Sequence, residues 1–173
     1  MDETEKSIRD HKDRVNKKMQ AFSSLVSERG SHHDDSKLEE PEISGWRQMD
    51  KEPRYPYGSP EYFDKLKRYE WVLKEHYRRN SHHLEHYSNF LGEMDLLDLT
   101  EMLMDWISYK DNLTYQETEK VLTQQAARYN LPPFLVSILR NTVLRMFVKS
   151  DDFAELFDIE PSALDLADFE KEN

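Results

Sequence analysis

The chain has 173 residues, a formal net charge of -11 and no cysteine. This length accommodates one compact domain with a sizeable core, and the lack of cysteine excludes disulfides, thiolate metal sites and a cysteine nucleophile. No apolar run approaches the roughly 20 residues of a membrane helix, and the charged N-terminal sequence is unlike a signal peptide. We therefore expect a cytoplasmic protein with no membrane partner.

Glycine and proline are scarce, with four and seven copies, which disfavours a turn-rich β fold and favours long helices. The expected fold is all-α, a single-domain bundle of about six helices over residues 1–150. The first helix should run from Ser7 to Glu28 and end at Gly30. Its apolar stripe recurs at steps of three and four, should be buried, and comprises His11, Val15, Met19, Phe22 and Val26.

A polar loop over residues 30–40 precedes a short helix expected after Pro41. Ser59 as a cap, with Pro60 at the first helical position, predicts a further helix that should reach Arg79. The sequence "NSHHLEHYSNFLG" that follows breaks the helical pattern, so we expect a loop containing a turn or two.

Asp95 should cap the next helix, "LLDLTEMLMDWISYK", which is apolar over most of its surface. Thr114 and Glu117 have the spacing of a capping box, which predicts a helix to about Tyr129. Residues 133–149 predict one more strongly apolar helix.

Residues 151–173 form a distinct acidic segment, with nine acids against one lysine and so a charge of about -8 by simple counting. Apolar residues recur among the acids, which is unlike a purely solvating tail. Two interpretations stay open: the segment docks on the helical body, or it is a peptide that binds a partner such as a host protein.

All seven histidines lie between positions 11 and 86, and such clustering suggests a site. Neutral imidazole is the commonest nitrogen ligand for divalent transition metals, and a neighbouring carboxylate supplies a harder oxygen that can bridge two ions. The adjacent pair His33 and Asp34 offers both ligand types. Lys37, three residues later, offers a compact positive charge suited to a phosphate.

These groups also have structural interpretations. His11 and His76 could be ordinary core histidines on apolar stripes, and Lys37 an exposed lysine. Asp98 could serve only as a helix-capping residue beside Asp95.

Glu101 and Asp105 are harder to explain in structural terms. They share one side of an apolar helix, where buried carboxylates need either a metal or arginines opposite them.

The order of His11, then His33 and Asp34, then Asp105 resembles the H…HD…D signature of the HD-domain phosphohydrolase superfamily. The stretch "HDDSK" is also similar to the HDxGK variant of a subgroup with extra histidines, although Ser36 replaces its glycine. The resemblance implies an HD-like helical bundle, one or two divalent metals and hydrolysis of a phosphate ester, often in a nucleotide.

More closely, "HKDRV", "HDDSK", "HYRRNSHH" and "EMLMDW" resemble an uncharacterised family found largely in bacteria and bacteriophages. This resemblance covers roughly residues 8–110 and carries no established activity.

The superfamily resemblance implies a site with residues in two roles. The metal ligands, for one or two ions of Mn, Fe, Co, Ni, Zn or Mg, would be His11, His33, Asp34, His76, His82, His83 and Asp105. The remaining site residues would be Lys37 and Arg78 as phosphate ligands and Glu101 as the group that orients a ligand histidine. Asp34 would bridge the two ions, and an activated water would attack phosphorus.

Two other functions remain open from the sequence. One is a non-catalytic phage protein with a structural metal site that binds a host protein through residues 151–173. The other is a metal-dependent nuclease, which is less favoured because the body lacks the extended basic, aromatic-interleaved surface that binds nucleic acid strands.

Overall fold

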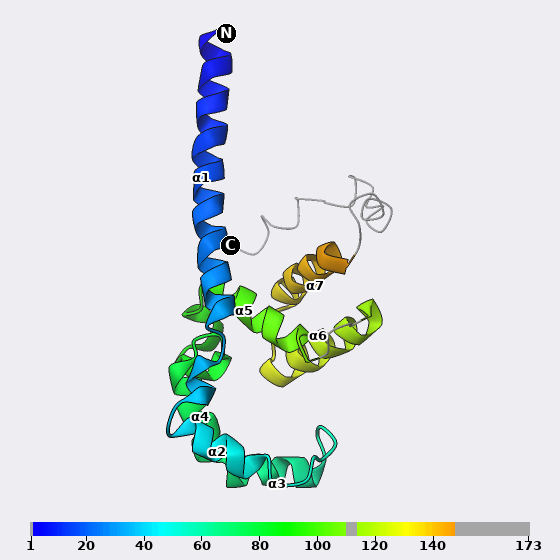
Figure 1. The fold of residues 1–173 in the computed structure, drawn as a ribbon. Coiled ribbons are helices and arrows are strands. Elements are labelled where there is room, and N and C mark those ends of the chain that lie inside the picture. The colour runs from blue at the N-terminus through cyan, green and yellow to red at the C-terminus, as the bar shows by residue number, and fades with distance from the viewer. Residues whose placement is uncertain (1, 110–113, 148–173) are drawn as a thin grey trace. The chain divides into compact units, whose positions relative to one another are not determined.

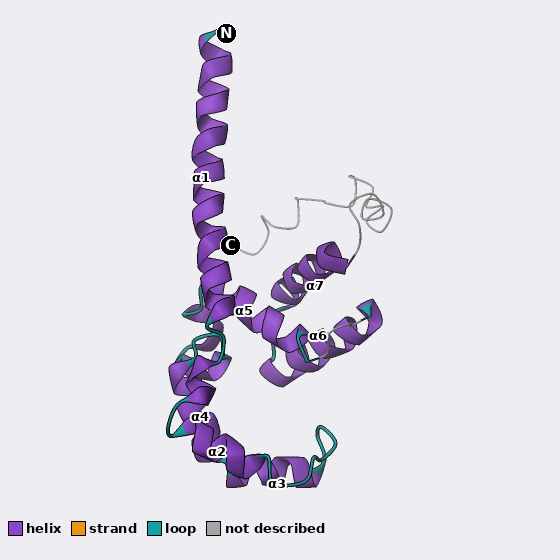
Figure 2. Ribbon diagram, in the orientation of Figure 1, coloured by secondary structure: helices purple, strands orange, loops and turns teal. Residues whose placement is uncertain are grey.

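The computed structural model describes residues 2–109 and 114–147, and this part of the chain contains helices and loops but no strand. The all-α fold class expected from the sequence is confirmed, with seven α-helices among the described residues (Figures 1 and 2). The chain divides into two compact units, residues 1–105 and 106–173. The acidic segment 151–173 lies outside the described residues. Within the described ranges, no helix combines the length and apolar character needed to cross a bilayer.

The first unit contains four complete α-helices and most of a fifth. They are α1 (Glu3–Ser31), α2 (Glu42–Met49), α3 (Pro60–Arg68), α4 (Glu70–Arg79) and α5 (Leu96–Ile107). Short 3-10 helices lie in the connections at Asp35–Leu38, Leu84–His86 and Phe90–Gly92, and the last two correspond to the turn or two expected in that loop. The apolar core of this unit includes Val72, Leu84, Met102 and Leu103, each at most 2% exposed.

Helix α1 is longer than expected and differently placed. Asp2 caps it by accepting from the amide of Glu5 at 2.7 Å, and the helix continues through Gly30 to Ser31, so the predicted end at Gly30 is wrong. None of its 29 residues is buried, which corrects the expectation that its apolar stripe belongs to the core. Its C-terminal end joins the rest of the unit through Arg29, which binds side chains of α5.

Two predicted caps are confirmed in this unit. The Ser59 side chain accepts from the amide of Tyr62 at 3.1 Å, and Asp95 accepts from the amide of Asp98 at 2.9 Å. The single helix expected up to Arg79 is instead two helices, α3 and α4. They are separated at Tyr69, whose backbone (φ -106°, ψ 22°) departs from helical values and accepts an i to i+3 hydrogen bond from Val72.

Gly45 allows α2 to lie close against α4. A Cβ built at Gly45 would overlap the Val72 side chain and lie 2.8 Å from the Trp71 ring. We expect Gly45→Ala to lower the free energy of unfolding by about 1–3 kcal/mol, the usual cost of overpacking. Thermal or denaturant unfolding followed by circular dichroism measures this loss.

Gly30→Ala is the matched control, because nothing lies within 4 Å of a Cβ built at Gly30 in α1. In a helix interior alanine is favoured over glycine by about 0.5–1 kcal/mol, so this variant should be as stable as the wild type or more stable. Equal stability of the two alanine variants would show that the contact at Gly45 is not tight.

The second unit contains α6 (Tyr115–Tyr129) and α7 (Pro133–Phe147), which pack against each other. The predicted capping box is confirmed: the Thr114 side chain accepts from the amide of Glu117, whose carboxylate accepts from the amide of Thr114. Among the described residues of this unit, the buried apolar ones are Ile107, Leu122, Leu131, Leu135, Leu139, Val143 and Leu144.

Candidate metal centre

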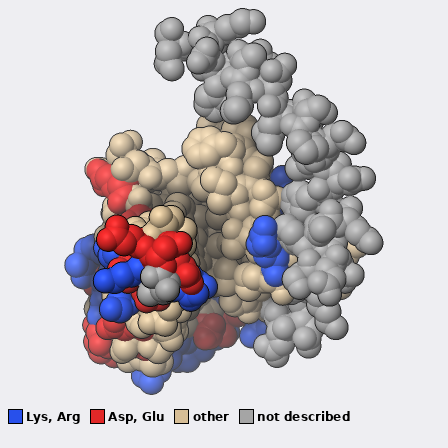
Figure 3. Space-filling view, turned by 90° about the horizontal axis from the view of Figure 1, so that it is seen from above, with Lys and Arg blue, Asp and Glu red and all other residues tan. Residues whose placement is uncertain are grey.

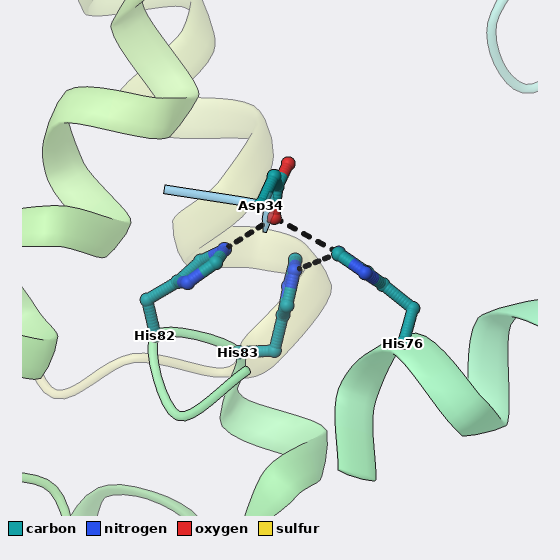
Figure 4. A group of neighbouring side chains, drawn as sticks. All are labelled: Asp34, His76, His82 and His83. Atoms are coloured by element: carbon teal, nitrogen blue, oxygen red, sulfur yellow. Dashed lines mark hydrogen bonds and ion pairs between the residues drawn. The ribbon is translucent and has the colours of Figure 1, made fainter. Parts of the chain in front are cut away.

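Three stretches of the first unit bring four potential ligand side chains together. Asp34 follows α1, His76 lies in the last turn of α4, and His82 and His83 lie in the loop after α4 (Figure 4). One donor atom from each residue lies within 4.8 Å of the others. Asp34 Oδ1 is 3.3 Å from His76 Nε2 and 3.6 Å from His82 Nε2, and His83 Nε2 is 2.9 Å from His76 Nε2. We call these four residues the inner group.

A second set of potential ligands shares Asp34 with the inner group. His33 Nε2 lies 3.3 Å from Asp34 Oδ2 and 3.5 Å from Asp105 Oδ1, and the three donor atoms form another set within 4.8 Å. We call His33, Asp34 and Asp105 the outer group. It is the more accessible of the two, because the side chains of His33 and Asp105 are 28% and 34% exposed while those of His76 and His82 are 3% and 2% exposed.

The backbone at Asp34 explains how one residue reaches both groups. Asp34 has φ 60° and ψ 18°, the left-handed conformation, and its carbonyl accepts from the amide of Lys37 at 2.8 Å as the 3-10 helix begins. Aspartate and asparagine adopt this conformation more readily than most residues. The chain therefore turns sharply after α1 and directs the Asp34 carboxylate between the two sets of histidines.

Glutamate carboxylates contact the Nδ1 atoms of three histidines and thereby fix the orientation of the rings. Glu42, which is fully buried in α2, lies 2.9 Å from His76 Nδ1. Glu101 Oε1 in α5 lies 2.9 Å from His33 Nδ1 and 3.0 Å from His82 Nδ1. A carboxylate bound to the Nδ1 proton leaves Nε2 as the free ligand atom, which is the arrangement found behind metal-bound histidines.

Two buried atoms at the centre of the inner group lack hydrogen-bond partners. They are Asp34 Oδ1 and His82 Nε2. Buried polar atoms in proteins are almost always paired, so an unpaired acceptor and an unpaired ring nitrogen directed at one point need an explanation. A cation held between them satisfies both atoms, and the donor set of three imidazoles and a carboxylate suits a divalent transition metal.

The pKa values of the inner group favour metal-ligand protonation states. Burial, together with the neighbouring imidazoles of His82 and His76, lowers the pKa of His83 to about 3. Burial also lowers the pKa of His76. Burial acts to raise the pKa of Asp34, but Lys37 and the adjacent imidazoles outweigh it and hold that pKa below its usual value. Neutral imidazoles beside an ionised carboxylate are the forms that bind metal.

The outer group is electrostatically different. The hydrogen bond to Asp105, with a second one to Glu101, raises the pKa of His33 to about 10. Burial acts to raise the pKa of Glu101, but its hydrogen bonds from His33, His82 and Arg29 hold it well below its usual range. A proton on His33 thus adds to the positive charge of Arg29 and Lys37 beside these carboxylates, and a cation at the outer group would replace that proton.

Arg29 connects α1 to the site. Its Nε lies 2.6 Å from Glu101 Oε2, and one of its terminal nitrogens lies 2.7 Å from Asp98 Oδ1. Asp98 also accepts from the Ser81 and Tyr87 hydroxyls at 2.6 Å each. Asp98 is therefore held by Arg29 and hydroxyl groups, in addition to its position beside Asp95, and it belongs to neither ligand group.

The structure brings most of the predicted site residues together, with two exceptions. His11 is exposed on α1, 22 residues before His33, which corresponds to about 33 Å along a helix. Arg78 pairs with Glu75 and its side chain is 69% exposed, away from both ligand groups. The placement of His11 at the site of its own chain is therefore wrong, whereas phosphate binding by Arg78 stays a prediction. Lys37 does lie at the site, with Nζ 2.5 Å from Asp34 Oδ2.

Two residues that the sequence analysis missed support the site. Glu42 lies in the acidic stretch "EEPE", and the composition of this stretch is typical of a solvated loop. Arg29 ends a helix, where a basic residue is ordinarily explained by the helix dipole. The expectation that buried Glu101 needs a metal or an arginine opposite it could have led to Arg29, because Arg29 is such an arginine.

The fold and the cluster define an all-helical protein with a group of imidazoles and carboxylates that could bind a metal. Comparison with curated proteins gives no match, and comparison with solved structures gives none either. The chain belongs to DUF5662, a family of unknown function whose model matches residues 1–145.

Proposed function

We propose that this protein is a metal-dependent phosphohydrolase acting on a nucleotide or a related phosphate ester. The position of Asp34 carries the proposal. Its Oδ1 faces the inner histidines and its Oδ2 faces His33, so one carboxylate is shared by two ligand groups. If ions occupied both groups, Asp34 would supply an oxygen ligand to each, as a two-metal hydrolytic centre requires.

The ligand sets fit one or two divalent ions of Mn, Fe, Co, Ni, Zn or Mg. The inner group offers three imidazoles and one carboxylate, which favours the later transition metals, and the outer group offers one imidazole and two carboxylates, which also suits Mn or Mg. When bound, such ions would lower the pKa of a coordinated water and offset the charge on phosphoryl oxygens.

The remaining roles fall to residues of this chain. Glu42 and Glu101 orient the imidazoles of His76 and His82 through their Nδ1 atoms. Lys37, whose side chain is 40% exposed beside Asp34, would contact the phosphate as it approaches. The similarity to HD-domain phosphohydrolases supports this proposal through His33, Asp34 and Asp105.

Elemental analysis of the purified protein, followed by a phosphate-release screen, tests the proposal. We expect at least about one equivalent of a divalent metal, and release of phosphate from members of a panel of nucleoside mono-, di- and triphosphates. Protein isolated without metal that takes up none on titration would exclude the mechanism. Stoichiometric metal with no turnover, together with copurification of a host protein, would favour the non-catalytic alternative.

A further inference from the structure

The apolar stripe of α1 is unusual because it is exposed along a long helix. Ile8, Met19 and Phe22 are 63%, 62% and 37% exposed, and Val15 is 45% exposed. Helices in proteins are stabilised mainly by packing an amphipathic face, so a 29-residue helix with no buried residue lacks its usual source of stability.

The spacing of this stripe is that of a coiled-coil seam. Ile8, Val15 and Phe22 are separated by seven residues, as are Met19 and Val26, and the two series alternate at steps of four and three. Two more residues extend these series toward the metal centre: Arg29 follows Phe22 by seven, and His33 follows Val26 by seven. The stripe therefore leads directly to the outer group.

A second copy of α1 fits this stripe in the antiparallel direction. If Met19 of one copy faces Phe22 of the other, then Val15 faces Val26, so the apolar positions from Val15 to Val26 meet apolar partners. The same register places Ile8 level with His33 of the other copy, and His11 level with Gly30. His11 is then about 4.5 Å along the helix axis from the level of His33, at a rise of 1.5 Å per residue.

The charges on α1 favour the antiparallel direction over the parallel one. Residues 12–18 carry four basic side chains, Lys12, Arg14, Lys17 and Lys18, against one acid, whereas residues 19–28 contain a single charged residue, Glu28. A parallel pair would place each basic residue beside the same residue of the other copy, with Lys12 in the seam. Lys12 lies in the seam in either direction and faces Arg29 in the antiparallel register, but the antiparallel pair opposes residues 14–18 to residues 23–27, which are uncharged. Charged side chains also surround the N-terminal end of α1, which would lie beside the other copy's metal centre (Figure 3).

The outer group is incomplete in a single chain. It offers three ligands, and two of them, His33 and Asp105, are partly exposed. Transition metals in proteins usually take at least four ligands, of which a catalytic site leaves one to water, so the three ligands of the outer group leave room for one more. We propose that two copies of this protein associate antiparallel through α1, and that His11 of each copy completes the outer group of the other. The second part of this inference rests on the proposed metal centre.

The oligomeric state gives the first test. Sedimentation should show a dimer for the wild type and a monomer for Phe22→Glu, with helical circular dichroism retained. The control is Ser24→Glu, because Ser24 is exposed on α1 outside the stripe, and this variant should remain a dimer. A monomeric wild type would overturn the proposal.

The direction of pairing can be read from engineered cross-links, since the natural chain has no cysteine. Copies carrying Val15→Cys and copies carrying Val26→Cys, given different tags and mixed, should form a disulfide between unlike copies. Each variant alone should cross-link poorly. Efficient cross-linking of Val15→Cys with itself would indicate parallel pairing and contradict the proposal.

Mixed dimers test the transfer of His11 between copies. If His11 acts across the dimer, His11→Ala homodimers should retain about one ion per chain and Asp34→Asn homodimers essentially none. A dimer of one His11→Ala copy and one Asp34→Asn copy, isolated through two tags, should regain about two ions in its His11→Ala copy. The readout is metal content by elemental analysis.

The outcomes separate this inference from the proposed function. If the mixed dimer holds about one ion, or if the His11→Ala homodimer keeps the full metal content, the transfer of His11 is wrong while the metal centre stands. If the wild-type dimer itself takes up no metal, the proposed function fails as well.

Discussion

Asp34→Asn is expected to lower metal affinity more than about 100-fold and to abolish phosphate release, while the helical circular dichroism stays unchanged. Loss of a residue that only orients a ligand already costs about 10–100-fold in affinity, and Asp34 supplies an oxygen to both ligand groups. Asparagine keeps the size of the side chain and tolerates the left-handed backbone at this position, which alanine would strain by about 1–2 kcal/mol. Isothermal titration with Mn and Zn measures the effect.

Asp35→Asn provides the control for this change. Asp35 is the next residue, is exposed, and belongs to neither ligand group, so the substitution removes the same charge without removing a ligand. Its metal affinity should match that of the wild type. An equal loss of affinity in both variants would show that net charge, and not coordination by Asp34, determines binding.

Glu101→Gln is expected to lower the free energy of unfolding by about 2–4 kcal/mol, because it breaks a largely buried network. Glu101 Oε1 accepts from His33 and His82, and Oε2 accepts from Arg29. An amide has a single acceptor oxygen, so one orientation opposes its NH2 group to Arg29 and the other opposes it to the imidazoles. The melting temperature should fall by about 5–10 °C, as measured by thermal denaturation in the presence of a chelator.

Glu75→Gln makes the same chemical change at an exposed ion pair. Glu75 pairs with Arg78, whose side chain is 69% exposed, and water and salt screen such exposed pairs so that they contribute little to stability. We therefore expect a melting temperature close to that of the wild type. If Glu101→Gln is equally harmless, the hydrogen bonds around Glu101 are not what holds α1 and α5 together.

The helices of this protein were predictable where local chemistry sets their ends. The caps at Ser59, Asp95 and Thr114 are determined by residues within three positions in the sequence, and all three were found from spacing alone. The break at Tyr69 was not predictable in this way, because the apolar spacing continues across it and α3 and α4 read as one helix.

The types of the residues and their grouping in the sequence were enough to predict part of the candidate site. His33 and Asp34 are adjacent, and the choice of Asp105 over Asp98 followed from the capping position of Asp98, so these residues could be selected before any contact was known. His11 was misplaced because periodicity shows that residues share a face but not what covers that face. Glu42 was missed because its burial depends on the packing of α2 on α4, which no local pattern reveals.

The candidate ligand residues lie far apart along the chain, at 33–34, 76–83 and 105, and this spacing would link ion binding to folding of the first unit. An ion held there would act as a removable cross-link among the end of α1, the end of α4 and α5. The thermodynamic coupling is direct. A free ion concentration of 100 times the dissociation constant adds about 2.7 kcal/mol to the free energy of unfolding of a unit that binds one ion only when folded. Availability of metal in the cell would then set how long this unit survives proteolysis, independently of any turnover.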